Sequence, residues 1–235
     1  MYEPLRGKVA IVTGGTRGIG RAIAARLLDE GVAVAVCGTS PATVEKATNE
    51  LSGGAQKFLA EIADVSKLDD VQRFFKSVDE RLGTVDFLVN NAGVGIYKPV
   101  LDLAPEEWHR MMNLNLTGAY YCSREALRRM VGRGGYIINI SSLAGTNAFA
   151  GGAGYNASKF GLNGFSEAMM MDHRYDGVRV SYVMPGSVAT DFGSSGPADW
   201  KIAPEDIAEV VTTLLRMPER TTVSRVEIRP SKPKK

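Results

Sequence analysis

A tyrosine and a lysine lie four residues apart, at Tyr155 and Lys159, where the sequence predicts the first turns of a helix. This spacing places both side chains on one face of the helix. A phenol exchanges protons near neutral pH only when its pKa falls from about 10, and a nearby ammonium lowers that pKa by favouring the phenolate. The pair is therefore a candidate for general acid–base chemistry, although an ordinary pair on a surface helix has the same spacing.

Polar side chains at the ends of other predicted elements strengthen this interpretation. Ser142 follows the predicted strand 136–140, where a hydroxyl can orient a substrate oxygen. Asn90–Gly93 closes the predicted strand 86–89, and Asn115 lies on a predicted helix between these two strands. Because ligands of open α/β sheets bind at the carboxyl ends of the strands, we expect these residues to share one site.

The segment Thr13–Gly20 joins the first predicted strand to the first predicted helix and is rich in glycine. Glycine lets a backbone turn tightly and approach a pyrophosphate without a Cβ clash, and a helix N-terminus offers N–H groups to the anion. Its glycines at 14, 18 and 20 do not follow the common G-x-G-x-x-G fingerprint. A tight turn without a ligand is the alternative interpretation.

The stretch Cys37–Ser40 holds no carboxylate, although folds that select NAD usually place an acid there for the ribose hydroxyls. Arg17 stands inside the glycine turn instead. A guanidinium together with the hydroxyls of Thr39 and Ser40 suits a 2′-phosphate. The sequence therefore predicts NADP(H) in preference to NAD(H).

Short β-rich runs alternate with helical patterns almost to the end of the chain. The predicted strands are 8–13, 32–37, 56–60, 86–89, 136–140, 178–183 and 226–228. The predicted helices are one from Ile19 to a cap at Gly31, then 41–51, 66–82, one opening at Pro105, 118–131, 155–175 and 204–217. This alternation predicts a single-domain α/β fold: a Rossmann-like, doubly wound parallel sheet of about seven strands with helices on both faces.

Composition excludes several other classes of protein. A net charge of +2, from 28 basic and 26 acidic residues, does not indicate the clustered basic surface that binds nucleic acid. The two cysteines show neither metal spacing nor a disulfide framework, so we predict no metal site. No apolar stretch approaches the ~20 residues that span a membrane, and no signal-like segment precedes the first strand. We expect a cytoplasmic protein with a flexible basic tail at 231–235.

Taken in order, these motifs resemble the short-chain dehydrogenase/reductase family over essentially the whole chain. Thr13–Gly20 is similar to the family's Thr-Gly-x-x-x-Gly-x-Gly turn, which accounts for the glycine spacing, and Asn90–Gly93 to its Asn-Asn-Ala-Gly block. Residues at family-like intervals match the family's catalytic tetrad: Asn115, Ser142, Tyr155 and Lys159.

The resemblance implies a role for each of these residues. Tyr155 would donate a proton to a carbonyl oxygen during reduction, or accept one during oxidation. Lys159 would lower the pKa of Tyr155 and bind the nicotinamide ribose. Ser142 would hydrogen-bond the substrate oxygen, with Ser141 as the less favoured neighbour, and Asn115 would hold a water that links Lys159 to solvent.

The resemblance also implies the cofactor contacts and the assembly. Asp64 matches the family's acid that holds the adenine, and Pro185–Thr190 looks like the segment that meets the nicotinamide. The expected cofactor contacts are Gly14, Thr16, Arg17, Gly18, Ile19, Gly20, Thr39, Ser40, Asp64, Val65, Asn91, Ala92, Gly93, Tyr155, Lys159, Pro185, Gly186, Val188 and Thr190. Family members commonly pair the helix that begins at Tyr155 between subunits, so we expect a homotetramer, with a dimer as second choice.

The leading prediction is an NADP(H)-dependent oxidoreductase that interconverts a small carbonyl compound and its secondary alcohol. A non-enzymatic NADP(H) sensor on the same fold is the main alternative, and a sugar-nucleotide epimerase would need another glycine spacing and a longer substrate domain. Mixed small and apolar segments at 94–98, 143–152 and 187–200 predict a modest substrate without high charge. The ending 224–230 departs from the family's usual glycine-rich segment, which weakens transfer of any specific substrate.

Overall fold

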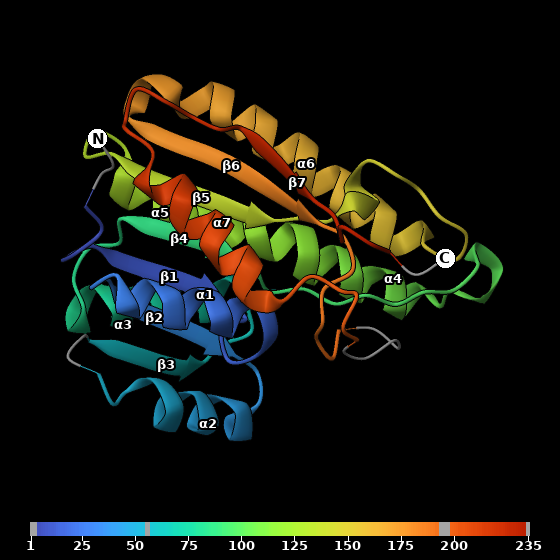
Figure 1. Ribbon diagram of the computed structural model, residues 1–235, viewed down its shortest axis with the longest axis horizontal. Coiled ribbons are helices and arrows are strands. Elements are labelled where there is room, and N and C mark those ends of the chain that lie inside the picture. The colour runs from blue at the N-terminus through green and yellow to red at the C-terminus, as the bar shows by residue number, and fades with distance from the viewer. Residues whose placement is uncertain (1–3, 55–56, 193–197, 234–235) are drawn as a thin grey trace.

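One parallel sheet of seven strands organises the computed structural model, which describes residues 4–54, 57–192 and 198–233 (Figure 1). The strands lie in the order β3-β2-β1-β4-β5-β6-β7, so the chain winds outward in both directions from β1 and β4. They are β1 (Val9–Thr13), β2 (Ala33–Gly38), β3 (Phe58–Ile62), β4 (Phe87–Asn90), β5 (Gly135–Ile140), β6 (Val178–Pro185) and β7 (Arg225–Ile228). The predicted doubly wound α/β sheet is confirmed.

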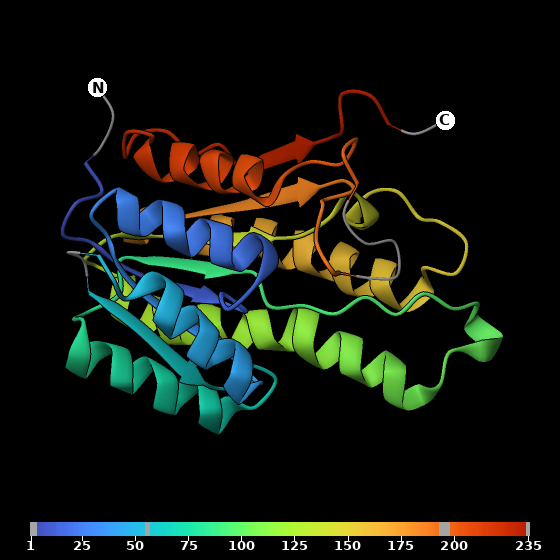
Figure 2. The same ribbon diagram turned by 60° about the horizontal axis from the view of Figure 1, so that its bottom comes forward.

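Helices cover both faces of this sheet (Figures 1 and 2). Helices α1, α2 and α7 pack on one face, and α3, α5 and α6 pack on the other. The helices are α1 (Gly18–Asp29), α2 (Pro41–Leu51), α3 (Leu68–Arg81), α4 (Pro105–Met112), α5 (Gly118–Met130), α6 (Ala153–His173) and α7 (Pro204–Arg216).

Strand β1 shows why the central strands are apolar throughout rather than alternating. Ala10 and Val12 belong to the core shared with α1 and α7, whereas Val9 and Ile11 belong to the core shared with α3 and α5. Successive strand residues point to opposite faces, so a strand with helices on both sides buries every side chain. All five residues of β1 are buried.

The ends of several elements differ from the prediction. Strand β3, predicted at 56–60, lies at Phe58–Ile62 because its pairing with β2 continues to Gly38; Gln56 is outside the described residues. Strand β6 continues past the predicted end at 183, since Pro185 pairs with Ile228 of β7. Helix α6 ends two residues before the predicted end at 175, and Gly177, with φ +75°, closes the turn that follows.

The predicted helices that open at Pro105 and at 118 are joined without a break. A single π-helical turn, Asn113–Thr117, links α4 to α5 and carries Asn115. Such turns have no side-chain pattern of their own, so a sequence pattern shows only two helices here. Inserted π turns are frequent at functional sites, which draws attention to Asn115.

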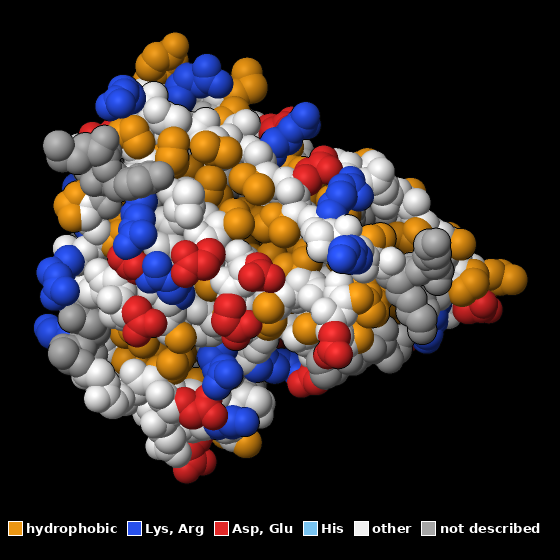
Figure 3. Space-filling model, viewed as in Figure 1, with side chains coloured by type: hydrophobic (Ala, Val, Ile, Leu, Met, Phe, Trp, Pro, Cys, Tyr) orange, Lys and Arg blue, Asp and Glu red, His pale blue; other side chains and the backbone are white. Residues whose placement is uncertain are grey.

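The surface agrees with the near-neutral net charge. Acidic and basic side chains are interspersed over the face shown in Figure 3, which carries no broad area of one sign. Among the described residues, no helix is long and apolar enough to cross a membrane, and no group of three His, Cys, Asp or Glu residues is placed to hold a metal ion.

Candidate active site

A cavity of about 1500 Å³ opens where β1, β2, β4, β5 and β6 end, the edge to which the strand arrows point in Figure 1. Its walls include most of the residues singled out from the sequence, brought from one end of the chain to the other. Of the predicted catalytic and cofactor residues, only three do not line it: Gly20, Asp64 and Asn115. The predicted site therefore forms one continuous space.

Tyr155 and Lys159 lie on successive turns at the start of α6, and both are buried. The Lys159 Nζ donates a hydrogen bond to the Ile140 carbonyl at 2.9 Å. It lies 5.9 Å from the centroid of the Tyr155 ring. The helix thus presents both side chains to the end of β5.

Burial dominates the proton equilibria of both groups. It raises the pKa of Tyr155, and the nearby Tyr97 adds to that rise, while a hydrogen bond with Ser142 opposes it. Burial lowers the pKa of Lys159 to about 8. In this structure the Lys159 ammonium bonds the Ile140 carbonyl rather than the phenol, so its predicted lowering of the Tyr155 pKa stays a prediction. Tyr155 is therefore a neutral phenol near pH 7, the form that donates a proton.

The two adjacent serines after β5 differ in their surroundings. The Ser141 hydroxyl is buried and donates to the Asn163 Oδ1 at 2.5 Å. The Ser142 hydroxyl is only partly buried and accepts a hydrogen bond from the Ala144 N–H at 3.1 Å. Ser142 is consequently the better placed of the two to meet a substrate oxygen.

The Asn115 side chain does not line the cavity and instead forms hydrogen bonds with groups beside it. Its Nδ2 donates to the Val94 carbonyl at 2.9 Å and to the Ser158 hydroxyl at 3.0 Å. Its Oδ1 accepts from the Val94 N–H at 2.8 Å. The side chain is thus committed to holding the loop after β4 against α6, and its predicted contact with a water stays a prediction.

Hydrogen bonds from α6 also hold the segment 139–147, and the sequence did not reveal them. The Asn156 Nδ2 donates to the Ala144 carbonyl at 2.6 Å, and the Asn163 Nδ2 to the Gly145 carbonyl at 3.0 Å. One further turn along, the Ser166 hydroxyl accepts from the Asn139 Nδ2 at 2.7 Å. The signal available was the spacing of polar residues along one helix face at 156, 159, 163 and 166.

The glycine turn has the shape that a dinucleotide phosphate requires. Gly14 and Gly18 adopt φ values of +62° and +54°, which residues with a Cβ rarely adopt. Helix α1 begins at Gly18, and no side chain at its N-cap, Arg17, bonds its first N–H groups. Those groups and the positive end of the helix face an anion directly. The residues present therefore fit a bound pyridine dinucleotide.

The end of β4 is fastened to this turn. The Asn91 Nδ2 donates to the Thr13 carbonyl at 3.0 Å and to the Gly14 carbonyl at 3.2 Å. The Thr13 hydroxyl accepts the backbone N–H groups of Asn91 and Ala92 at 3.0 and 3.1 Å. The two walls of the cofactor space are thus built as one unit.

Asp64 stands behind the cavity wall that its neighbours Ala63 and Val65 form. Its Oδ1 accepts hydrogen bonds from the Ser66 N–H at 3.0 Å and the Ser66 hydroxyl at 2.7 Å. The carboxylate therefore shapes the start of the segment before α3. Its predicted contact with the adenine stays a prediction.

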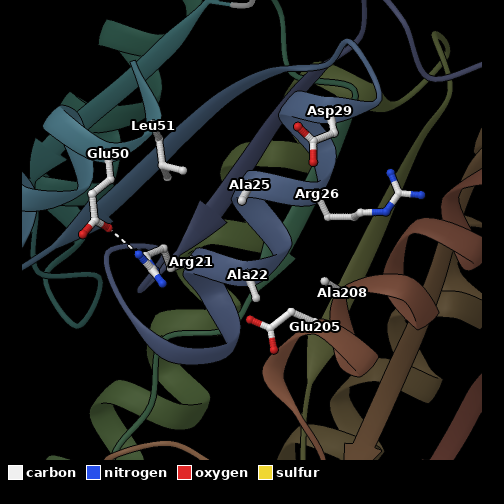
Figure 4. Close-up of a pocket in the computed structure, with 9 residues that line it drawn as sticks. All are labelled: Arg21, Ala22, Ala25, Arg26, Asp29, Glu50, Leu51, Glu205 and Ala208. Carbon is white, nitrogen blue, oxygen red and sulfur yellow. Dashed lines mark hydrogen bonds and ion pairs between the residues drawn. The ribbon is translucent and has the colours of Figure 1, made fainter. Parts of the chain in front are cut away.

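A smaller cavity of about 330 Å³ adjoins the first, between α1, α2 and α7 (Figure 4). Arg21 lines both cavities and forms an ion pair with Glu50, drawn as a dashed line in Figure 4. Arg17, one helical turn earlier, is exposed on the wall of the large cavity, which Thr39 and Ser40 also line. Unlike Arg21, Arg17 has no ion pair among the described residues.

Three aromatic side chains that the sequence did not single out lie at the same end of the cavity as Tyr155. Tyr97, Phe149 and Phe192 fall within the segments expected to contact substrate, and all three line the cavity. The Tyr97 ring lies edge-on to the Tyr155 ring, with centroids 5.5 Å apart. Their presence gives the substrate end of the cavity an apolar wall.

Comparison with known proteins agrees with this site. The profile of the short chain dehydrogenase family matches residues 8–199. A 3beta-hydroxysteroid dehydrogenase of Mediterraneibacter gnavus is 36% identical over 205 residues, which cover 86% of this chain and 73% of that protein.

Solved structures show the same architecture. An alcohol dehydrogenase from the archaeon Thermococcus sibiricus, complexed with 5-hydroxy-NADP, is 33% identical with a TM-score of 0.90, covering 97% of this chain and 99% of that one. A metagenomic short-chain oxidoreductase in complex with NADP is 36% identical with a TM-score of 0.86, covering 98% and 100%. The chain therefore belongs to the short-chain dehydrogenase/reductase family of pyridine-nucleotide-dependent oxidoreductases.

Proposed function

We propose that the protein is an NADP(H)-dependent oxidoreductase that interconverts a small carbonyl compound and its secondary alcohol, with Tyr155 as general acid and base. The observation that carries this proposal is the convergence of Tyr155, Lys159 and Ser142 on one cavity that also contains the glycine turn. A bound nicotinamide dinucleotide supplies or accepts the hydride at this site.

The protein's own residues handle the substrate oxygen. Ser142 hydrogen-bonds that oxygen and orients it toward the Tyr155 hydroxyl. During reduction the neutral phenol donates its proton as negative charge develops on the oxygen; during oxidation the phenolate removes the alcohol proton. Lys159, held by Ile140 at the end of β5, is positioned to bind the nicotinamide ribose and to stabilise the phenolate.

The preference for NADP(H) rests on Arg17 and on the absence of a carboxylate in Cys37–Ser40. A guanidinium forms strong charge-assisted hydrogen bonds with phosphate, whereas a carboxylate there would repel a 2′-phosphate. The two solved relatives above are complexes with NADP or a derivative of it, which supports the same choice.

Replacing the phenol with a ring of the same shape tests the proton-transfer role. Tyr155→Phe should lower kcat by about three orders of magnitude and leave the Kd for NADPH within about twofold. Turnover is followed by loss of NADPH absorbance with a panel of ketones, and Kd by cofactor fluorescence. Tyr175→Phe, at a side chain that is 93% exposed, is the matched control. Near-normal turnover in Tyr155→Phe would remove Tyr155 from the mechanism.

Removing the exposed guanidinium tests the cofactor preference. Arg17→Ala should weaken NADPH binding by at least about tenfold, the value of one charge-assisted hydrogen bond, and change NADH binding little. Arg73→Ala, at an exposed arginine of α3 that does not line the cavity, is the control. A wild-type protein that prefers NADH by tenfold, or an Arg17→Ala variant that loses both cofactors equally, would contradict the assignment.

The buried ammonium of Lys159 is expected to lower the stability of the fold. Its pKa is 10.5 in an exposed lysine and about 8 here, so at about pH 7 the folded state holds a charge that burial disfavours. Lys159→Met should raise the free energy of unfolding on the order of 2 kcal/mol at that pH while abolishing turnover.

The higher free energy of unfolding of Lys159→Met, relative to the wild type, should decrease as the pH rises. Between about pH 8 and 10.5 the folded wild type loses its proton before the unfolded chain does, so wild-type stability rises and its deficit against Lys159→Met shrinks. Urea unfolding at several pH values measures the difference. Lys76→Met, at an exposed lysine of α3, is the matched control. A variant that is less stable at every pH would show that the ammonium stabilises the fold.

We further propose a homotetramer assembled through the outer faces of α5 and α6. Tyr120 of α5 and Phe160 of α6 are both exposed, and the Tyr120 ring contacts the ring of Phe165 at a centroid distance of 6.3 Å. Exposed aromatic groups on adjacent helices favour contact with another subunit. Light scattering should give four times the mass of the chain; a dimer would limit assembly to one interface, and a monomer would refute the proposal.

A further inference from the structure

Four aromatic rings form a continuous row at the substrate end of the cavity. The row runs Phe149, Tyr97, Tyr155, Phe192, and successive centroids lie 5.7, 5.5 and 6.0 Å apart. The rings come from four separate segments of the chain. Such centroid distances are those of direct edge-to-face or tilted contact between aromatic groups.

Three members of this row are left open to the cavity: Phe149, Tyr97 and Phe192. Their exposed fractions are 47%, 41% and 43%, whereas Tyr155 is buried. Large aromatic side chains usually bury most of their surface, and a local group of exposed ones marks a binding surface. A ligand that covers them would remove apolar area from water.

Glycines make room for the row. A Cβ at Gly95 would lie 2.6 Å from the Tyr97 hydroxyl oxygen and 2.9 Å from a ring carbon of Phe192. A Cβ at Gly152 would lie 2.7 Å from a ring carbon of Phe149. The backbone beneath the rings is therefore suited to their present positions.

The surroundings of the row disfavour charge. Desolvation raises the pKa of Tyr97, and desolvation is also the largest cause that raises the pKa of Tyr155. A carboxylate or phosphate placed against Tyr97, Phe149 and Phe192 would meet the same desolvation penalty. An uncharged, apolar group would meet none.

We propose that this aromatic row selects carbonyl compounds and alcohols whose reacting carbon is part of, or attached to, a flat uncharged ring system. This inference rests on the proposed function, because it requires the reacting oxygen to lie at the Tyr155 hydroxyl. With the oxygen there, the substrate ring lies against the exposed parts of Tyr97 and Phe192, which meet over Gly95. Phe149 extends the apolar wall for a second fused ring.

Ketones with equal numbers of carbon atoms test the inference. The wild type with NADPH should reduce 1-tetralone, which is flat and fused, with a kcat/KM about tenfold above that for linear 2-decanone. Edge-to-face and stacking contacts with the aromatic side chains of the row favour binding of 1-tetralone, although 2-decanone is the more hydrophobic ketone. Equal or higher efficiency with 2-decanone would overturn the inference and leave the proposed function standing.

Substitutions in the row identify the residues responsible. Phe149→Leu and Phe192→Leu keep apolar side chains but remove the rings, so each should raise the KM for 1-tetralone and reduce severalfold the ratio of kcat/KM for 1-tetralone to that for 2-decanone. Tyr175→Leu, at an exposed aromatic residue that does not line the cavity, is the matched control. An unchanged preference in both row variants would show that the rings only shield Tyr155 from water.

A binding measurement separates this inference from the proposed function. Calorimetry of Tyr155→Phe with NADPH, in which the row keeps all four rings, should give a lower Kd for 1-tetralone than for 2-decanone. If no ketone is turned over by the wild type while this preference in binding holds, the proposed function fails and the selectivity of the row stands. Equal Kd values would overturn the inference whatever the turnover.

Discussion

The chemistry of this protein depends on hydrogen bonds that fix α6 against β5 and the loop after it. Tyr155 and Ser142 are 13 residues apart in sequence, and nothing local holds them together. Buried donors from α6, among them Asn156 and Asn163, reach the carbonyl groups of that loop. A shift of the helix by one residue would leave several buried amides unpaired, at about 1–3 kcal/mol each. This penalty makes one alignment far more stable than its neighbours.

The same burial that makes the alignment specific sets the proton chemistry. Removing Tyr155 and Lys159 from water disfavours the charged form of each, so the phenol gains affinity for its proton and the ammonium loses some. The site therefore starts as a neutral acid beside a cation that water does not stabilise. Any group that pairs with that cation gains more here than it would at the surface, because the surrounding dielectric is low. For the same reason, we expect the buried ammonium to lower the stability of the fold.

The sequence predicted the sheet and most helices because both faces of the sheet are covered, and continuous apolar runs such as Val9–Thr13 have few other interpretations. It placed β3 two residues early, since an edge strand with one buried face carries a weak pattern. It missed the polar contacts of α6, because asparagines on a helix resemble a solvent-exposed face until the facing carbonyl groups are known. The role of the turn Asn113–Thr117 was hidden for a similar reason: its geometry depends on Asn115 bonding to Val94, far along the chain.

The two ends of the cavity differ in how well they tolerate amino-acid substitutions. At the end that holds the glycine turn, the backbone forms the wall: Gly14 and Gly18 adopt positive φ values, and Asn91 ties β4 to the turn, so few substitutions preserve the shape. At the substrate end, partly exposed side chains such as Phe149 and Phe192 form the wall. Replacing a partly exposed side chain alters stability little compared with a core residue. Substrate choice can therefore diverge among relatives while the cofactor turn and the alignment of α6 stay fixed.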